Sequence, residues 1–325
     1  MIQRFAVPVG AGAVSALLFA LTVKGTALAY ALAFLAPMPL MIAAFGWGAL
    51  GGLLAAAVAS LALVAVFDLQ GSLTFLLAVA APAWILQTFS VLPRCAPPWR
   101  RGDPDVPART PVGAVVTLAA ALGALAGLAF LATLISGGGY EAGLQELISE
   151  LTPMAEQASQ GVDVLPEGVS ARDFAEYVAK LAPLATATVA FLVLCLNLYA
   201  AARSTALSRR LPRPWPDLPT EFVLPRPLAF VTVVAVGAAI ALPEPTDQFA
   251  WVFAGPLGAA YALQGLAVLH AMSRGLPLRP LLMVALYFCC AIRAGGTLPL
   301  IGLVGLVDSA VNLRGRAAAA SRSKI

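Results

Sequence analysis

Long apolar runs, separated by polar gaps whose charges alternate in sign, constrain this chain more than any other feature. Almost none of its ionisable side chains, 20 Lys and Arg and 16 Asp and Glu, lies inside such a run. The three largest gaps are in turn basic, acidic and basic; they carry Arg94, Arg100, Arg101 and Arg109, then Glu141, Glu146, Glu150, Glu156, Asp163, Glu167, Asp173 and Glu176, then Arg203, Arg209, Arg210, Arg213 and Arg226. Loops rich in Arg and Lys stay cytoplasmic, so the pattern predicts a polytopic, all-α membrane protein.

Composition supports this prediction and excludes a soluble domain. The chain is 60% hydrophobic and only 11% charged, with a mean hydropathy of +0.89, whereas roughly a quarter of the residues of a soluble domain are charged. The basic residues lie just outside apolar runs and form no stripe. We therefore expect anionic membrane lipids as partners, and no nucleic acid.

The N-terminal block has room for about four membrane crossings of roughly 20 residues each. Between Phe5 and Leu92 the only charged residues are Lys24 and Asp68. We predict helices over 5–23, 26–45, 47–67 and 72–92, with turns at Lys24, around Gly48 and at Asp68. The first helix is expected to be retained and not cleaved as a signal peptide. A cytoplasmic N-terminus then places the basic loop 93–110 in the cytoplasm.

The remaining apolar runs predict six further crossings. Helices are expected over 111–135, 183–202, 227–242 and 249–272, and the stretch 280–313 is interrupted at Arg293–Thr297 into two short crossings, the first of which is short enough to be re-entrant instead. A basic connector, 203–227, and a basic tail, 314–325, are cytoplasmic. Gly123 and Gly127 form a GxxxG pair, which allows close helix packing but also arises by chance in a chain with 28 glycines.

Segment 136–181 is acidic, and so we expect it outside the membrane. Its apolar residues Leu144, Leu147, Ile148, Leu151 and Met154 follow helical spacing and predict an amphipathic helix that Pro153 limits or kinks. A second short helix starts at Ser170, with Asp173 as a capping-box variant, and runs towards Pro183. Together they predict a lid that packs on the protein itself.

Ten crossings place both termini in the cytoplasm. Sixteen Lys and Arg residues then lie inside and four outside, namely Lys24, Arg172, Lys180 and Arg293. The chain is accordingly expected to be a single integral domain, 1–325, of a bacterial cytoplasmic membrane.

No cofactor or enzyme activity is expected. Cys95, Cys195, Cys289 and Cys290 have no CxxC spacing and no cluster with the single histidine, His270, so neither a zinc site nor a redox pair is indicated. The sequence has no HExxH, GxSxG or Walker A motif. An ATP-driven step would need another chain.

Charged residues at membrane depth suggest a functional site. Asp308 and Asn312 share one face of the last helix, where Asp308 either pairs with an arginine such as Arg314 or acts as a coupling carboxylate. Lys24, Asp68 and Arg293 map to the external surface. They either cap helices and pair with one another, or line the mouth of a cavity beneath the lid.

Neutral polar residues form a second set of candidates: Gln87, Asn197, Tyr261 and Gln264. They serve either as interhelical packing groups or as the polar lining of a solute site. His270 is expected at a helix end, where it interacts with the helix dipole.

The order of these features resembles the YybS-like family of bacterial membrane proteins. The resemblance rests on Pro37-Met-Pro39, Leu181-Ala-Pro-Leu184, Asn197-Leu-Tyr-Ala-Ala-Ala-Arg203, Arg213-Pro-Trp-Pro216, Gly305-Leu-Val-Asp308 and Asn312-Leu-Arg314. That family is distantly similar to the substrate-binding membrane subunits of energy-coupling-factor transporters. Those subunits dock through small residues on their first helix, and Ala16 and Ala20 have that spacing here.

Two functions remain open from the sequence. The first is binding or transport of a small solute through a cavity that opens beneath 136–181, with Asp308 or an ATPase partner supplying the coupling; Asp308→Asn should then abolish uptake without unfolding the protein. The alternative is a non-enzymatic envelope assembly or scaffold protein that holds partner proteins through its loops.

Overall fold

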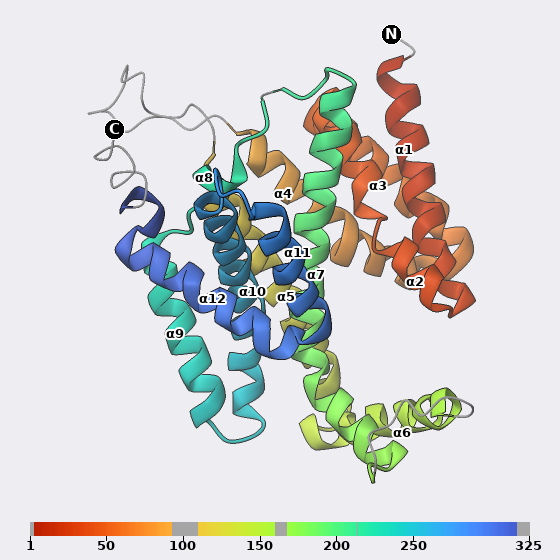
Figure 1. The fold of residues 1–325 in the computed structure, drawn as a ribbon. Helices are drawn as coiled ribbons and strands as arrows, with labels where there is room; N and C mark the ends of the chain where they lie inside the picture. Colours follow the sequence, from red (N-terminus) through yellow and green to blue (C-terminus); the bar gives the residue numbers. More distant parts are fainter. Residues whose placement is uncertain (1–2, 93–109, 160–167, 213, 317–325) are drawn as a thin grey trace, which may run out of the picture. The chain divides into compact units, whose positions relative to one another are not determined.

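The computed structural model describes residues 3–92, 110–159, 168–212 and 214–316 (Figure 1), and these residues form helices and connecting turns without any strand. Five of the helical stretches are long and apolar enough to cross a membrane: Phe5–Lys24, Ala27–Val91, Val112–Ser136, Ala171–Leu207 and Thr246–Met272. Shorter apolar helices accompany them. The all-α prediction is confirmed, and the chain is a multi-pass helical membrane protein.

The N-terminal block forms a series of helices with breaks near the predicted turns. Its elements are α1 (Gln3–Ala20), a 3₁₀ turn (Leu21–Lys24), α2 (Ala27–Ala33), α3 (Pro37–Phe75), a π turn (Leu76–Ala80) and α4 (Ala81–Val91). Inside α3 the backbone leaves the helical region at Gly48 (φ 80°) and Asp68 (φ 67°), so the 39-residue element consists of three pieces. An additional break at 34–36, before Pro37, was not predicted.

The turn residues explain the breaks in chemical terms. Gly48 has no Cβ and adopts its positive φ without steric cost. Asp68 has a positive φ that is unfavourable for a residue with a side chain. Its Oδ1 accepts a hydrogen bond from the N–H of Gly71 at 3.0 Å, which offsets part of this cost. The capping interpretation of Asp68 is thereby supported.

The chain divides into two compact units, and the division falls inside α5 (Val112–Ser136), α7 (Ala171–Leu207) and α10 (Thr246–Met272), and after the first residue of α9 (Arg226–Ala241). Unit 1 comprises Met1–Ala119, Leu192–Arg226 and Ala260–Ile325; unit 2 comprises Ala120–Phe191 and Pro227–Ala259.

In unit 1, α1 packs closely on α3 through small residues. A Cβ added at Gly12 would collide with the carbonyl oxygen of Ala55. Ala16 is buried in the same core together with Ala59 and Leu63, and Ala20 packs against it. The small-residue face that the resemblance assigns to docking a partner is therefore occupied by the chain's own core.

In unit 2, the GxxxG pair packs α5 on α7. A Cβ at Gly123 would lie 2.6 Å from the carbonyl oxygen of Ala187, and one at Gly127 would lie 2.7 Å from the Ala187 Cβ. Both glycines therefore mark a close helix contact.

The described residues of segment 136–181, which are 136–159 and 168–181, are largely helical, and neither Pro153 nor Pro183 ends a helix. Helix α6 (Tyr140–Ser159) continues beyond Pro153, and α7 runs through Pro183 as one 37-residue helix, so the predicted short lid helix and sixth crossing are continuous. A proline removes one backbone hydrogen bond, and the packed turns on either side maintain the helix. The Ser170–Asp173 capping box is confirmed, because the Asp173 N–H donates to Ser170 Oγ at 3.1 Å.

The C-terminal part contains α8 (Leu218–Glu221), α9 (Arg226–Ala241), α10, α11 (Arg279–Ile292) and α12 (Ala294–Val311), with the predicted interruption at Arg293. The 14 residues of α11 extend only about 21 Å, less than the roughly 30 Å of a bilayer core. A tilted or re-entrant α11 remains the alternative to an upright crossing.

Candidate functional site

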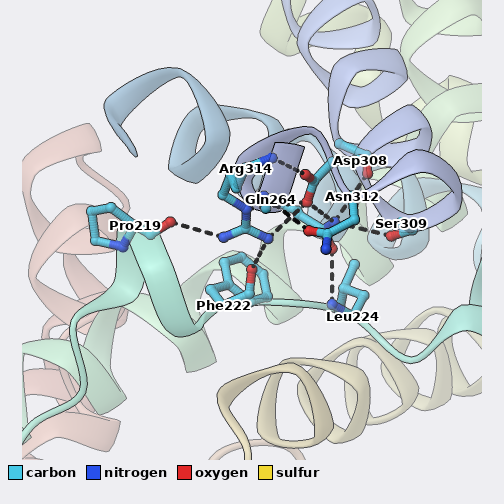
Figure 2. A network of polar contacts seen from close by, with 10 residues as sticks. Pro219, Phe222, Leu224, Gln264, Asp308, Ser309, Asn312 and Arg314 are labelled. Carbon is cyan, nitrogen blue, oxygen red and sulfur yellow. Dashed lines mark hydrogen bonds and ion pairs between the residues drawn. The ribbon is translucent and has the colours of Figure 1, made fainter. Parts of the chain in front are cut away.

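A buried polar network lies in unit 1 where α12 ends. Asn312 adopts a left-handed conformation (φ 52°) and its N–H donates to the Asp308 carbonyl at 2.8 Å. This turn brings Arg314 back onto Asp308, with 2.7 Å between Nη2 and Oδ2 and 3.2 Å between Nε and Oδ2. The side chains are 10% (Arg314) and 2% (Asp308) exposed. We call Gln264, Asp308, Ser309 and Arg314 the Arg314 network (Figure 2).

The network continues from α12 into the connector and α10. Arg314 also donates to the carbonyl oxygens of Pro219 and Phe222, each at 2.8 Å. Gln264 Oε1 accepts the backbone N–H of Leu224 at 2.8 Å. Figure 2 shows these groups converging from separate segments of the chain.

The amide nitrogen of Gln264 faces three acceptors. It lies 3.0 Å from the Gly305 carbonyl, 3.2 Å from Asp308 Oδ2 and 3.0 Å from Ser309 Oγ. An amide carries two hydrogens, so every donor of Gln264 has an acceptor. Asp308 Oδ2 accepts from both Arg314 and Gln264, and Oδ1 accepts the Arg314 N–H at 3.3 Å, so the network is arranged to hold elements together.

The structure unites only some of the candidates from the sequence. Asp308 and Gln264 belong to the network, Asn312 forms its turn, and the buried hydroxyl of Tyr261, near Ser309, has no hydrogen-bond partner among the described residues. The predicted pairing of Asp308 with Arg314 is present. Asp68 caps a helix, whereas Lys24 and Arg293 are exposed and form no ion pair within the described part of the chain.

Asn197 and Gln87 are not joined to the network. Asn197 is fully buried and its Nδ2 donates to the carbonyl oxygens of Phe34 and Val193, each at 2.8 Å. Its Oδ1 and the Oε1 of Gln87 have no hydrogen-bond partner among the described residues. Asn197 therefore acts as a packing group that links α7 to the break before Pro37, which is one of the two roles expected for it from the sequence.

A second polar group, in unit 2, was not singled out from the sequence. Tyr140, at the start of α6, interacts electrostatically with Glu244, just before α10, and with Asp247 in its first turn, and Gln248 Nε2 donates to Asp247 Oδ2 at 3.4 Å. We call these four residues the Tyr140 cluster. Tyr140 and Gln248 are 6% and 4% exposed. The Tyr140 hydroxyl, Asp247 Oδ1 and Gln248 Oε1 are buried and have no hydrogen-bond partner in the described ranges. Only the unusual burial reveals the cluster, and burial is not visible in sequence spacing.

The electrostatics of the Tyr140 cluster are acidic. Burial, and then the nearby carboxylates Glu244, Asp247 and Glu141, raise the pKa of Tyr140 to about 12. Its hydroxyl therefore keeps its proton at neutral pH. Lys180 bridges Glu244 at 3.5 Å and Glu176 at 3.3 Å, and this compensates part of the negative charge.

A second ion pair holds the connector 203–227 in place, and it predicts that the stability of the protein depends on pH. Arg274 forms a bidentate pair with Asp217, at 2.8 and 2.7 Å. The hydrogen bonds from Arg274, and then from Thr220, lower the pKa of Asp217 from its ordinary 3.8 to about 2. A lowered carboxyl pKa stabilises the folded state above the unfolded value, and this contribution is lost as the pH falls from about 4 to about 2.

We therefore expect wild type to melt at a higher temperature than Asp217→Asn at pH 6, and the difference to shrink as the pH falls from about 4 to about 2. Melting curves of both proteins across this range test the prediction. An equal difference at both ends of the range would contradict a role for the Asp217 charge.

Metal and redox sites receive no support from the geometry. Within the described residues no group of three or more His, Cys, Asp and Glu side chains could hold a metal ion. Cys195, Cys289 and Cys290 are free thiols, and Cys95 lies outside the described residues. His270, expected to interact only with its helix end, also lies 2.8 Å from the Tyr287 hydroxyl.

Comparison with known proteins gives a family but no characterised relative. No curated protein matches the chain, and no solved structure matches it either. A family model described as "Predicted membrane protein (DUF2232)" matches residues 105–309. This match covers more than half of the chain, including α5 to α11 and the Gln264–Asp308 part of the Arg314 network. The chain therefore belongs to the DUF2232 family of predicted membrane proteins.

Proposed function

We propose that the protein binds a small solute rich in N–H donors at the Tyr140 cluster and contributes to its passage across the bacterial cytoplasmic membrane. The observation that carries the proposal is the set of three buried, unpartnered polar atoms in this cluster. Buried polar groups are almost always hydrogen-bonded, and an unpaired one costs about 1–3 kcal/mol. A solute that supplies the missing partners recovers this free energy on binding.

The cluster's chemistry indicates the class of solute. Asp247 Oδ1 and Gln248 Oε1 accept hydrogen bonds, and the protonated Tyr140 hydroxyl can donate or accept. Three carboxylates, Glu141, Glu244 and Asp247, lie around Tyr140, and Lys180 pairs with Glu244. The cluster therefore has a net negative charge. A cationic amine or amidine therefore fits better than a carboxylate or phosphate.

Helix α6 supplies the means of access. Gly138 and Gly139, with φ of 120° and 103°, join it to α5. Tyr140, the first residue of α6, is buried with Leu144 and Ile148 against α5 and α7. We propose that α6 is a lid on the external side of the membrane, and that rotation at the two glycines uncovers the cluster.

This assignment shifts the coupling hypothesis away from Asp308. The resemblance to the YybS-like family, and through it to energy-coupling-factor subunits, supports a solute-binding role. The occupied Ala16 face gives no support to an ATPase partner docked as in those subunits. We propose that the protein itself catalyses no reaction and that both of its termini lie in the cytoplasm.

Binding can be tested by thermal shift of the detergent-purified protein against amines, amino acids, nucleobases, vitamins and metal ions. We expect a saturable rise in melting temperature with an amine-bearing solute, and an affinity at least tenfold weaker in Gln248→Met. This variant keeps the side-chain length and removes the acceptor oxygen. Gln145→Met, at an exposed α6 glutamine, is the matched control and should bind as wild type does.

Two results would overturn the proposal. One is the absence of any shift across the panel with a well-folded protein. The other is equal affinity in wild type and Gln248→Met, which would place the solute elsewhere.

A scaffold role is the second candidate, favoured by the Arg314 network. That network fixes the connector segment 219–224 through fully bonded groups, as a rigid docking surface requires. Co-purification of a stable complex after mild solubilisation, without solute binding, would support it.

A further inference from the structure

The end of α7 carries a concentration of arginine and aromatic side chains that neither proposed function uses. Arg203, Arg209 and Arg210 lie within eight residues of one another, and all three are exposed. Two aromatic contacts accompany them: the guanidinium of Arg210 lies 4.6 Å above the Trp47 ring, and Tyr199 meets Trp215 edge-on at 5.9 Å. All of these residues belong to unit 1.

These arginines differ from Arg274 and Arg314, which hold the connector, in having no carboxylate partner among the described residues. Arg274 and Arg314 each have a carboxylate partner, Asp217 and Asp308. Arg203, Arg209 and Arg210 have no carboxylate partner within the part of the chain that the structure describes. Their charge is therefore uncompensated, and an anion from outside the chain is the natural complement.

The local backbone fixes the main chain at the end of α7, and the Trp47 ring positions the guanidinium of Arg210. Helix α7 ends with the Arg209 N–H donating to the Ala206 carbonyl at 3.0 Å and the Arg210 N–H to that of Thr205 at 3.1 Å. Arg209 occupies the left-handed position (φ 53°) that glycine ordinarily takes at such an end. The aliphatic part of the Arg210 side chain then passes Gly46 on its way to Trp47. A Cβ built on Gly46 would lie 3.9 Å from the Arg210 Cδ.

The surroundings indicate a lipid and not a free anion. Leu196 and Leu207 on α7 are 57% and 89% exposed, and Tyr199 is 44% exposed. Apolar side chains next to Trp, Tyr and Arg are typical of the boundary between the acyl chains and the headgroups of a bilayer. A phospholipid can contact the leucines with its acyl chains while its phosphate meets the guanidinium groups.

We propose that Arg203, one helical turn after Tyr199, and Arg210, stacked on Trp47, form a binding site for the phosphate group of an anionic phospholipid. The site is independent of the Tyr140 cluster, which lies in unit 2. It selects anionic lipid by local geometry, beyond the general attraction of the basic surface.

The test compares two double variants that remove the same charge. Purified protein is titrated with phosphatidylglycerol, phosphatidylcholine or inorganic phosphate, and melting temperature and retained lipid (by native mass spectrometry) are recorded. We expect saturable stabilisation by phosphatidylglycerol only. Arg203→Gln/Arg210→Gln should weaken it about tenfold or more, since each cation near an anionic surface contributes roughly 1 kcal/mol.

Arg226→Gln/Arg279→Gln is the matched control, because these arginines lie at the starts of α9 and α11, where Arg226 is exposed and Arg279 is half-buried. It should retain nearly wild-type affinity. Equal weakening in the two double variants would show diffuse electrostatics and overturn the site. Stabilisation by inorganic phosphate would assign the guanidinium groups to a soluble anion, and an unaffected Arg203→Gln/Arg210→Gln would exclude these residues.

Discussion

Replacing Asp308 with asparagine is expected to lower the free energy of unfolding by about 3 kcal/mol, because it leaves the guanidinium of Arg314 buried without its counter-charge. Arg314 is only 10% exposed and shares two of its hydrogen bonds with Asp308 Oδ2. Thermal unfolding of the purified variant measures the loss. This replaces the sequence-based expectation that Asp308→Asn would spare the fold and abolish uptake.

A double variant separates the ion pair from a general defect. Asp308→Asn combined with Arg314→Gln removes both charges, so its loss should be smaller than the sum of the two single losses. Asp68→Asn is the control for a carboxyl-to-amide change at an exposed site. Wild-type stability in Asp308→Asn, or strictly additive losses, would show that the pair does not hold the α12 end in place.

Replacing Gly265 with alanine is expected to cost about 2 kcal/mol, because α10 and α12 approach too closely there for a methyl group. A Cβ at Gly265 would overlap the carbonyl oxygen of Ile301 and lie 2.8 Å from its Cγ2. Gly305, on α12, meets the Tyr261 carbonyl in the same way. The displacement would also move Gln264 relative to Gly305 and Asp308, so the Arg314 network should loosen.

Gly258 on the same helix is a matched control, because alanine is expected to stabilise the protein at this position. A Cβ at this position meets no atom within 4 Å, and alanine is favoured over glycine inside a helix by about 0.5–1 kcal/mol. Gly258→Ala should therefore raise the melting temperature while Gly265→Ala lowers it. A similar effect of both substitutions would contradict the close approach at Ile301.

Much of the fold could be predicted from local patterns. The breaks at Gly48 and Asp68, the start of α7 at the Ser170–Asp173 box and the interruption at Arg293 all lie where glycine, a capping side chain or a polar residue interrupts an apolar run. The error at Pro183, where a new helix was expected, has the same cause as the continuation of α6 through Pro153. A proline weakens a helix locally, whereas its continuation depends on packing against other helices, which the sequence does not display.

The candidate site was accessible only in part. The spacing of Asp308, Asn312 and Arg314 suggests that they meet at one helix end, and they do. Their partners could not be inferred, since Arg314 bonds the Pro219 carbonyl 95 positions away and Gln264 bonds the Leu224 N–H 40 positions away. Every residue carries the same backbone N–H and carbonyl groups (proline lacks the N–H), so no sequence motif shows which of them will bond a distant side chain.

By itself, the sequence determined that this chain is a multi-pass helical membrane protein, and placed most of its helices and turns. Span length, apolar composition and turn chemistry are properties of contiguous residues, so they can be read from short stretches of the sequence. Tertiary structure alone decided which polar groups are satisfied: it paired Asp308 with Arg314 and Gln264 and left Tyr140, Asp247 and Gln248 with buried atoms unpaired. Burial and hydrogen bonding depend on residues brought together from distant parts of the chain.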